Sequence, residues 1–198
     1  MNTVEPTAAA TCPQCGHLNP RAARACDCGY DFVSQTKSLT FFPVATRKLI
    51  VLSICTFSIY ELYWFYQNWK RIRAYAPHET FSPFWRAFFG VIWAIPLLQR
   101  MEEQAGAVGV AGTGSAVVLG VCYILLTISW RLPDPWWLVT FASCLPLIPV
   151  QRMCQRVNDA AQNPEGFNNR YSAANIVAVV LGGLVLTLSV IGTFLPPE

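Results

Sequence analysis

The residues best suited to chemistry are four cysteines near the N-terminus. They form two close pairs, Cys12-Pro-Gln-Cys15 and Cys26-Asp-Cys28. Zinc prefers four soft thiolates in a tetrahedron, and two tight turns whose sulfurs face one ion supply them. A glycine follows the second cysteine of each pair, where such a turn commonly needs a positive φ. The spacing therefore predicts a structural Zn²⁺ ion held by Cys12, Cys15, Cys26 and Cys28.

Two disulfide bonds in an exported domain are the alternative use of these cysteines. The first eleven residues lack the basic and apolar stretches of a secretory signal, so we expect a reducing compartment, where disulfides are rare. The second pair is one residue shorter than the usual zinc-binding pair, which weakens the pattern slightly. A structural role is favoured over a redox role, because a filled tetrathiolate site has no open position for a substrate.

The composition of the whole chain points to a membrane. Hydrophobic residues make up 54% of the 198 residues and charged residues only 13%, whereas a soluble domain carries about 25% charged residues. These values argue against a disordered chain and against a typical cytosolic enzyme. The net charge of +3 is too small to indicate nucleic-acid binding by itself.

Five apolar segments follow the cysteines, and they span residues 49–66, 84–98, 115–130, 136–150 and 174–195. Crossing a bilayer takes about 20 residues. Only the last segment meets this comfortably, and the second and fourth are short enough to be re-entrant. Ala174, Ala178 and Gly182 lie four apart on the last segment, which is equally compatible with one flat face packed against another helix and with ordinary helix composition. Buried helices of a soluble protein would need a polar shell that this chain lacks.

We therefore predict an all-α polytopic membrane domain with about five hydrophobic segments, some of them re-entrant, behind a small N-terminal zinc ribbon. The predicted division is a disordered tail at 1–11, the ribbon at 12–32, a linker at 33–44 and a multi-pass helical membrane domain at 45–198.

A run of aromatic rings leads directly into basic residues at the end of the first apolar segment. Amphipathic rings favour the headgroup layer, and neighbouring Lys and Arg side chains reach phosphates. An aromatic core stripe is the alternative. The run predicts a membrane interface at Tyr60, Tyr63, Trp64, Tyr66, Trp69, Lys70, Arg71 and Arg73.

The distribution of basic residues predicts the orientation. Arg100, Arg152, Arg156 and Arg170 fall in the loops at 99–114 and 151–173. Loops rich in Lys and Arg stay in the cytoplasm, so both loops and the N-terminus are predicted inside and the C-terminus outside. The basic run at 70–73 would lie outside if the first two segments both cross, and this conflict disappears if they re-enter.

Residues 12–20, Cys-Pro-Gln-Cys-Gly-His-Leu-Asn-Pro, precede Cys-Asp-Cys-Gly-Tyr-Asp-Phe at 26–32. This segment resembles the zinc ribbons at the front of many bacterial membrane proteins, which implies zinc at the four cysteines. Thr-Phe-Ser-Ile-Tyr at 56–60, followed by Tyr-Trp-Phe-Tyr at 63–66, is similar to uncharacterised bacterial membrane families with a T-x-G-I-Y…Y-W-F-Y signature. Ser58 stands where those families carry glycine, and the resemblance implies no activity.

Three classes of function remain open. The first is a non-enzymatic adapter or scaffold of the bacterial inner membrane, whose cytoplasmic ribbon docks a protein partner while the helices contact the lipid bilayer. The second is a small transporter or channel subunit, although the last three apolar segments carry no Asp, Glu, Lys, Arg or His. The third is a membrane-tethered nucleic-acid-binding ribbon, which ranks last because three basic and three acidic residues balance in residues 1–40. No catalytic constellation is present in the sequence, so we expect no enzyme.

Overall fold

The computed structural model shows a mostly helical protein. It describes residues 10–13, 16–21, 23, 26, 30–32, 36–37, 39–76, 79–161 and 168–194. The disorder predicted for the N-terminal tail falls on residues 1–9, outside the described residues. Ala10 and Thr11, which the sequence placed in that tail, form strand β1 (Ala10–Thr11).

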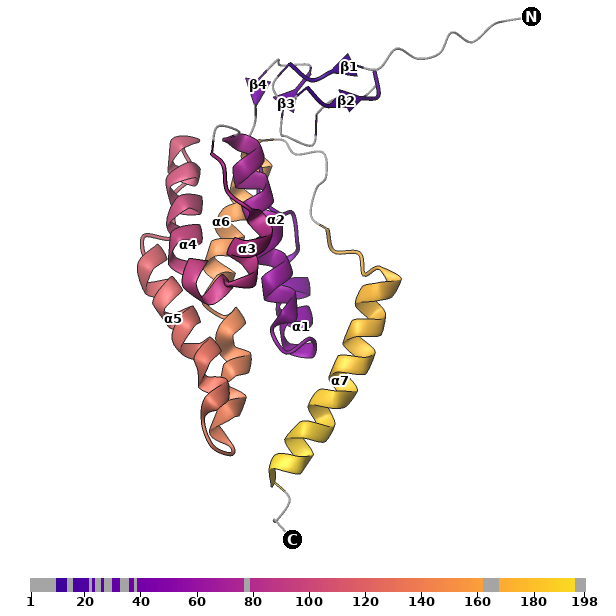
Figure 1. The fold of residues 1–198 in the computed structure, drawn as a ribbon, viewed down its shortest axis with the longest axis vertical. Helices are drawn as coiled ribbons and strands as arrows, with labels where there is room; N and C mark the ends of the chain where they lie inside the picture. Colours follow the sequence, from indigo (N-terminus) through magenta and orange to yellow (C-terminus); the bar gives the residue numbers. More distant parts are fainter. Residues whose placement is uncertain are drawn as a thin grey trace, which may run out of the picture.

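The described helices lie in an order that matches the apolar segments. They are α1 (Thr46–Cys55), α2 (Ile59–Tyr75), α3 (Pro83–Phe88), α4 (Gly90–Ala107), α5 (Ala116–Ile128), the 3₁₀ helices η1 (Ser129–Arg131) and η2 (Trp136–Cys144), α6 (Leu147–Ala160) and α7 (Ala173–Phe194). Helices α1 to α6 pack into a bundle, and α7 runs down one side of it (Figure 1). The C-terminal ends of α2, α4 and α6 all lie at the same end of the bundle.

Two small antiparallel hairpins stand beyond that same end of the bundle (Figure 1). Strand β1 pairs with β2 (Leu18–Asn19), and β3 (Tyr30–Asp31) pairs with β4 (Thr36–Lys37). The hairpins fall within and beside the range predicted for the ribbon. We call the end of the bundle next to them the ribbon end.

The first apolar segment is a helical hairpin rather than one span. Helix α1 has 10 residues, a length of about 15 Å at the rise of an α-helix. This is half of the hydrocarbon core of a bilayer, which is about 30 Å thick. The chain then turns at residues 56–58, and α2 runs back toward the ribbon end (Figure 1).

The turn between α1 and α2 places two residues other than glycine in the left-handed region, Phe57 at φ 52° and Ser58 at φ 64°. The N–H of Ser58 donates to the carbonyl oxygen of Ser53 at 2.8 Å, which closes the end of α1. The Oγ1 atom of Thr56 accepts a hydrogen bond at 3.0 Å from the N–H of Tyr60 and thereby caps the start of α2. The break therefore forms although Ser58 replaces the glycine of the resembling families.

Two helices in the described part of the chain are long and apolar enough to cross a membrane. One is the continuous helical stretch Trp136–Ala160, with 25 residues, and the other is α7, with 22 residues. Helix α5 with η1 is apolar but shorter. The five predicted segments are thus present as helices, but five spans are not found, because the first segment is divided by its turn and the second between α3 and α4.

Residues 39–45 form an irregular segment that lies in the core of the bundle, and we call it the strap. Within it, Leu39, Phe41 and Val44 are at most 3% exposed. The side chain of Asn158 on α6 accepts from the N–H of Phe41 at 2.7 Å and donates to its carbonyl oxygen at 3.0 Å. The sequence assigned residues 39–44 to a linker, and the structure instead buries them in the core, because their apolar side chains find a site between α2 and α6.

Two further amides hold the strap. Asn68 on α2 accepts from the N–H of Phe42 at 3.1 Å, and the Nε2 atom of Gln151 on α6 donates to the carbonyl oxygen of Val44 at 2.8 Å. The Oε1 atom of Gln151 accepts from the indole N–H of Trp64 at 2.6 Å. Asn68, Gln151 and Asn158 are fully or almost fully buried. Each one bonds backbone groups of the strap that would otherwise be buried without a hydrogen-bond partner.

Candidate functional site

The candidate metal centre lies in the two hairpins. Of the predicted ligands, Cys12 and Cys26 are described, and they are 1% and 5% exposed. Asn19, itself buried, donates from Nδ2 to the sulfur of Cys26 at 3.4 Å and to the carbonyl oxygen of His17 at 2.9 Å. Asn19 therefore links the first hairpin to the sulfur of the second cysteine pair.

The backbone around Cys12 forms the tight turn that a zinc-binding pair needs. The N–H of Cys12 donates to the carbonyl oxygen of His17, and the N–H of Gly16 donates to the carbonyl oxygen of Cys12, both at 2.9 Å. Gly16 has φ 72°, as predicted for a glycine at this place. At the second pair, the N–H of Cys26 donates to the carbonyl oxygen of Tyr30 at 2.8 Å.

These residues fit a zinc ion, because buried sulfurs with an amide N–H donor nearby suit thiolates, which carry negative charge. The other two predicted ligands, Cys15 and Cys28, lie outside the described residues, as does Gly29. Within the described ranges, no three metal-ligating side chains come together. His17, which the sequence did not require as a ligand, is exposed.

The aromatic residues predicted for the membrane interface divide into two groups. Trp64 and Trp69 are 0% and 2% exposed and belong to the core, so the alternative of a core stripe holds for them. Trp64 bonds Gln151 of α6, and Trp69 is covered by Phe81, by Arg86 of α3 and by Trp93 of α4. Tyr60 and Tyr66 are partly buried against the core, and Tyr63 is 46% exposed.

The basic residues of that run lie in the last part of α2, at the ribbon end (Figure 1). Lys70 is exposed, Arg71 donates to Oγ1 of Thr40 at 3.3 Å, and Arg73 donates to the carbonyl oxygen of Phe81 at 3.3 Å. The turn between α1 and α2 therefore places the run 70–73 at the ribbon end, where α4 and α6 also finish.

The sequence missed a carboxylate in the interior of the bundle. Glu61, in the first turn of α2, is 0% exposed. The hydroxyl of Ser143 on η2 donates to its two carboxylate oxygens at 2.9 and 3.2 Å, and the hydroxyls of Ser143 and Ser58 lie 3.1 Å apart. Glu61 falls in the last third of the apolar segment 49–66, and only the turn at 56–58 shows that it lies in the first turn of a helix that runs back into the core.

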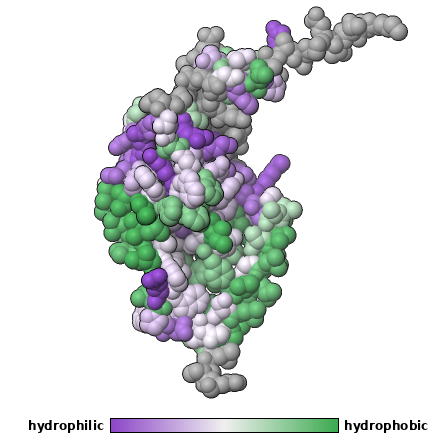
Figure 2. All heavy atoms as spheres, viewed as in Figure 1, coloured by the Kyte–Doolittle hydropathy of each residue, from purple (hydrophilic) through white to green (hydrophobic). Residues whose placement is uncertain are grey.

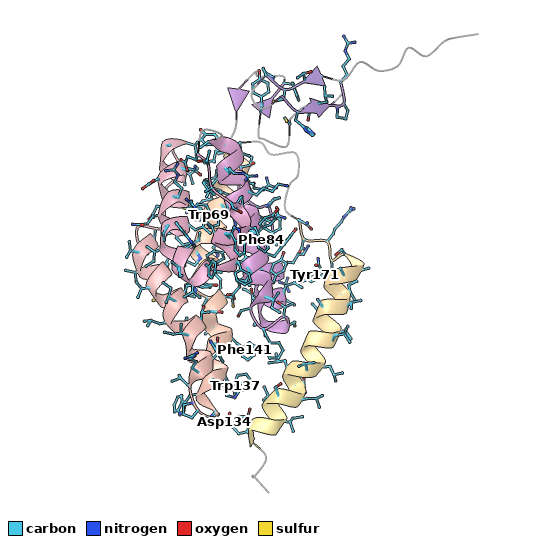
Figure 3. All side chains as sticks on the ribbon, in the orientation of Figure 1. Trp69, Phe84, Asp134, Trp137, Phe141 and Tyr171 are labelled. Atoms are coloured by element: carbon cyan, nitrogen blue, oxygen red, sulfur yellow. The ribbon has the colours of Figure 1, made fainter. Side chains whose placement is uncertain are left out.

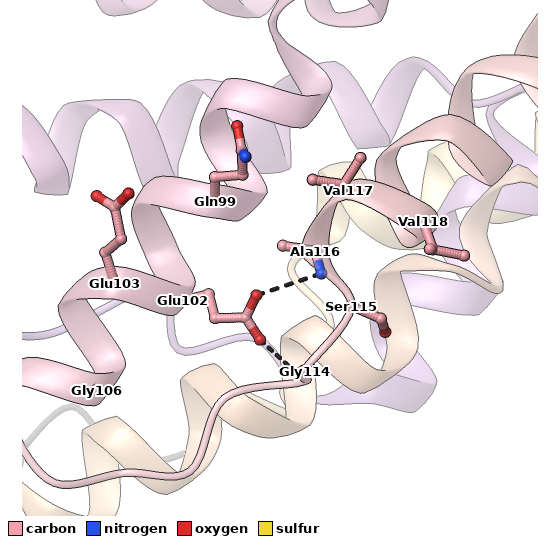
Figure 4. Close-up of a pocket in the computed structure, with 9 residues that line it drawn as sticks. All are labelled: Gln99, Glu102, Glu103, Gly106, Gly114, Ser115, Ala116, Val117 and Val118. Carbon is pink, nitrogen blue, oxygen red and sulfur yellow. Dashed lines mark hydrogen bonds between the residues drawn. The ribbon is translucent and has the colours of Figure 1, made fainter.

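A second carboxylate, Glu102 on α4, caps the start of α5 (Figure 4). It accepts hydrogen bonds from the N–H of Gly114 at 2.5 Å, the hydroxyl of Thr113 at 3.0 Å and the N–H of Ala116 at 3.3 Å. Partial burial opposes ionisation, but these hydrogen bonds outweigh it and lower the pKa of Glu102. A surface cavity of about 470 Å³ lies beside this cap.

Figure 3 places labelled aromatic rings at different depths of the molecule. Trp69 and Phe84 lie in the half of the bundle nearer the ribbon, and Trp137 and Phe141 lie near the opposite tip with Asp134. Tyr171 stands at the start of α7. Among the described residues, rings therefore occur near both ends of the longest helical stretch.

Comparison of the chain with family models, curated proteins and solved structures finds no match, so the sites above rest on the chain's own residues.

Proposed function

We propose that this protein is an adapter of the bacterial inner membrane, in which a zinc ribbon on the cytoplasmic side docks a partner protein and the helical bundle fixes that ribbon at the bilayer. The observation that carries the proposal is the strap at residues 39–45. An adapter needs its docking module held at a defined place, and the strap provides a rigid connection to the bundle.

The strap enters the core two residues after β4. Asn158 bonds both the N–H and the carbonyl oxygen of Phe41, and Phe42 and Val44 are held by Asn68 and Gln151. Hydrogen bonds of buried groups are costly to leave unmade. The bundle therefore holds the strap in place from Leu39 onward, which supports a ribbon kept next to the bundle.

Charge supports the cytoplasmic placement. The end of α2 carries the basic run 70–73, and α6, which finishes at the same end, carries Arg152 and Arg156. The opposite tip, at residues 129–137, carries one arginine and one aspartate. The positive-inside rule then puts the ribbon end in the cytoplasm.

The buried Glu61 favours a second candidate, a small transporter or channel subunit. Ionisable side chains inside a membrane bundle are costly and commonly serve the passage of protons or ions. The hydroxyls of Ser143 and Ser58 extend the polar group around Glu61.

Affinity capture from gently solubilised membranes tests the adapter proposal. We expect a specific partner to be retained by the wild type and lost by Cys12→Ser, which removes one zinc ligand. Cys122→Ser is the matched control, because Cys122 is an exposed cysteine on α5, away from the ribbon. A partner list unchanged by Cys12→Ser contradicts the adapter.

The transporter candidate is tested separately in proteoliposomes that report internal pH. If the bundle passes protons through Glu61, Glu61→Gln abolishes the flux and Glu103→Gln, at an exposed position of α4, leaves it intact. Equal flux in wild type and Glu61→Gln contradicts this candidate.

A further inference from the structure

The guanidinium of Arg86, on α3, lies among three aromatic rings. Its central carbon is 3.9 Å from the ring centre of Phe81 and 4.5 Å from the ring centres of Trp69 and Trp93. Each ring lies well within the 6 Å range of a cation–π contact. The three rings, from α2, α4 and the loop before α3, hold the cation in a fixed place.

The rings satisfy the charge of Arg86 but not its hydrogen-bond donors. A guanidinium carries five N–H groups, and aromatic faces interact with its positive charge rather than accepting these hydrogens in good geometry. Across the described ranges, the Arg86 side chain makes neither an ion pair nor a hydrogen bond. Arg86 is only partly buried, so its donors are open to an acceptor from outside the protein.

A second guanidinium contacts the same phenylalanine. Arg73 donates to the carbonyl oxygen of Phe81, and Arg86 lies over the Phe81 ring, so both cations touch this one residue. A surface cavity of about 570 Å³ is lined by Arg73, Glu79, Thr80, Phe81 and Ser82. Its acid, Glu79, is paired with Arg100. The groups of the cavity that remain for a ligand are the Arg73 guanidinium and two hydroxyls, which suits an anion.

The other side of α3 is apolar and exposed. The rings of Phe84, Trp85, Phe88 and Phe89 are between 48% and 58% exposed, and they contact one another. Ile92, at the start of α4, is 70% exposed. Figure 2 shows that hydrophobic residues cover the flank of the bundle where α4 and α5 lie, below the hydrophilic ribbon end. The exposed rings of Phe84, Trp85 and Phe88 thus belong to the same short helix as Arg86, and Phe89 ends that helix.

We propose that Arg73 and Arg86 bind the phosphate of an anionic phospholipid, whose acyl chains lie against the exposed rings of α3. Arginine matches phosphate because its planar fork forms paired hydrogen bonds. Two cations beside one phosphate favour an anionic headgroup such as phosphatidylglycerol over a zwitterionic one, whose ammonium they would repel. This site rests on the proposed membrane location.

The test uses the full chain in nanodiscs that mix phosphatidylglycerol and phosphatidylcholine. Either lipid carries bromine on its acyl chains, and tryptophan quenching reports which lipid lies next to the protein. We expect wild type to be quenched preferentially by brominated phosphatidylglycerol. Arg73→Gln and Arg86→Gln should each weaken that preference about tenfold, because each removes charged hydrogen bonds to the phosphate.

Arg131→Gln is the matched control, because Arg131 lies in η1 at the opposite tip. Arg73 is exposed, so Arg73→Gln is expected to fold even if Arg86→Gln does not. An unchanged preference in Arg73→Gln overturns the proposal. So does equal weakening in Arg131→Gln, which would show only a general effect of charge.

Two further experiments distinguish a lipid site from a site for free phosphate, and test the membrane location separately. If inorganic phosphate displaces brominated phosphatidylglycerol at the concentration where it binds alone, the site is one for free phosphate and the lipid proposal is wrong. Extraction of cell membranes with carbonate tests the location by itself. Protein that is extracted contradicts the membrane location, whereas protein that stays inserted but shows no lipid preference contradicts only this site.

Discussion

Gly182 of α7 lies directly against the backbone carbonyl oxygen of Cys55, the last residue of α1, and leaves no room there for a Cβ atom. Helix α7 buries none of its residues in the rest of the protein. The close approach at Gly182 favours a flat small-residue face on this helix over ordinary helix composition. Close backbone packing of this kind is a common basis of helix association in membranes.

Gly182→Ala is expected to separate α7 from α1 and to lower the free energy of unfolding by about 1–3 kcal/mol, the usual cost of overpacking. Gly183→Ala is the matched control, because nothing lies within 4 Å of a Cβ atom at Gly183. Thermal unfolding in detergent measures both variants. Equal melting temperatures for the two would show that the contact at Cys55 does not hold α7.

Glu102→Gln should destabilise the start of α5, since helix caps contribute about 0.5–2 kcal/mol. The hydrogen bonds to Glu102 lower its pKa below the usual 4.5, so the stabilisation is complete above that value and is lost as pH falls through the lower pKa of the folded protein. The difference in melting temperature between wild type and Glu102→Gln should therefore be constant at neutral pH and shrink below pH 4.5. Glu103→Gln, at the exposed neighbouring position, should show no such difference.

The purified protein should contain one zinc ion per chain, and Cys12→Ser should lose it. The binding energy of a structural zinc site, about 10–16 kcal/mol in comparable peptides, is the folding energy of so small a module. The helices should remain inserted, because their insertion depends on separate apolar segments. Metal analysis that finds no zinc in the wild type would refute the ribbon assignment, and Cys122→Ser should keep the wild-type metal content.

Single cysteines at positions 5, 70 and 160 should be protected from an impermeant thiol reagent added outside, and one at position 197 should be labelled. The chain for this test carries no other reactive thiol. Protection at position 70 follows from the turn between α1 and α2, which returns the basic run to the ribbon end. Labelling at 160 without labelling at 197 would reverse the orientation.

Asn158→Ala should lower the free energy of unfolding by at least about 2 kcal/mol, because it leaves the N–H and the carbonyl oxygen of Phe41 buried without partners. Asp159→Ala, at the exposed next position, should have little effect. Chemical denaturation in detergent measures the two variants. A neutral Asn158→Ala would mean that the strap does not fix the ribbon.

Hydrophobic runs in the sequence predicted helices at the correct places, since apolar character needs no knowledge of tertiary contacts. They did not predict the turn at 56–58, because its two left-handed residues are a phenylalanine and a serine rather than glycine. Without the turn, the buried position of Glu61 could not be recognised. The burial of the strap was not predicted for a related reason. The backbone N–H groups of Phe41 and Phe42 bond to Asn158 and Asn68, which lie more than twenty residues away in the sequence.

The turn that ends the short helix α1 gives the bundle an uneven cross-section along its length. That turn stops well short of the level reached by the tip between α5 and α6 and by the end of α7 (Figure 1). In a bilayer, α1 to α4 would displace lipid mainly from the leaflet on the ribbon side, whereas fewer helices would occupy the other leaflet. In such a bilayer the protein would be broader in the leaflet on the ribbon side, and a shape of that kind would suit a membrane whose ribbon-side surface is convex.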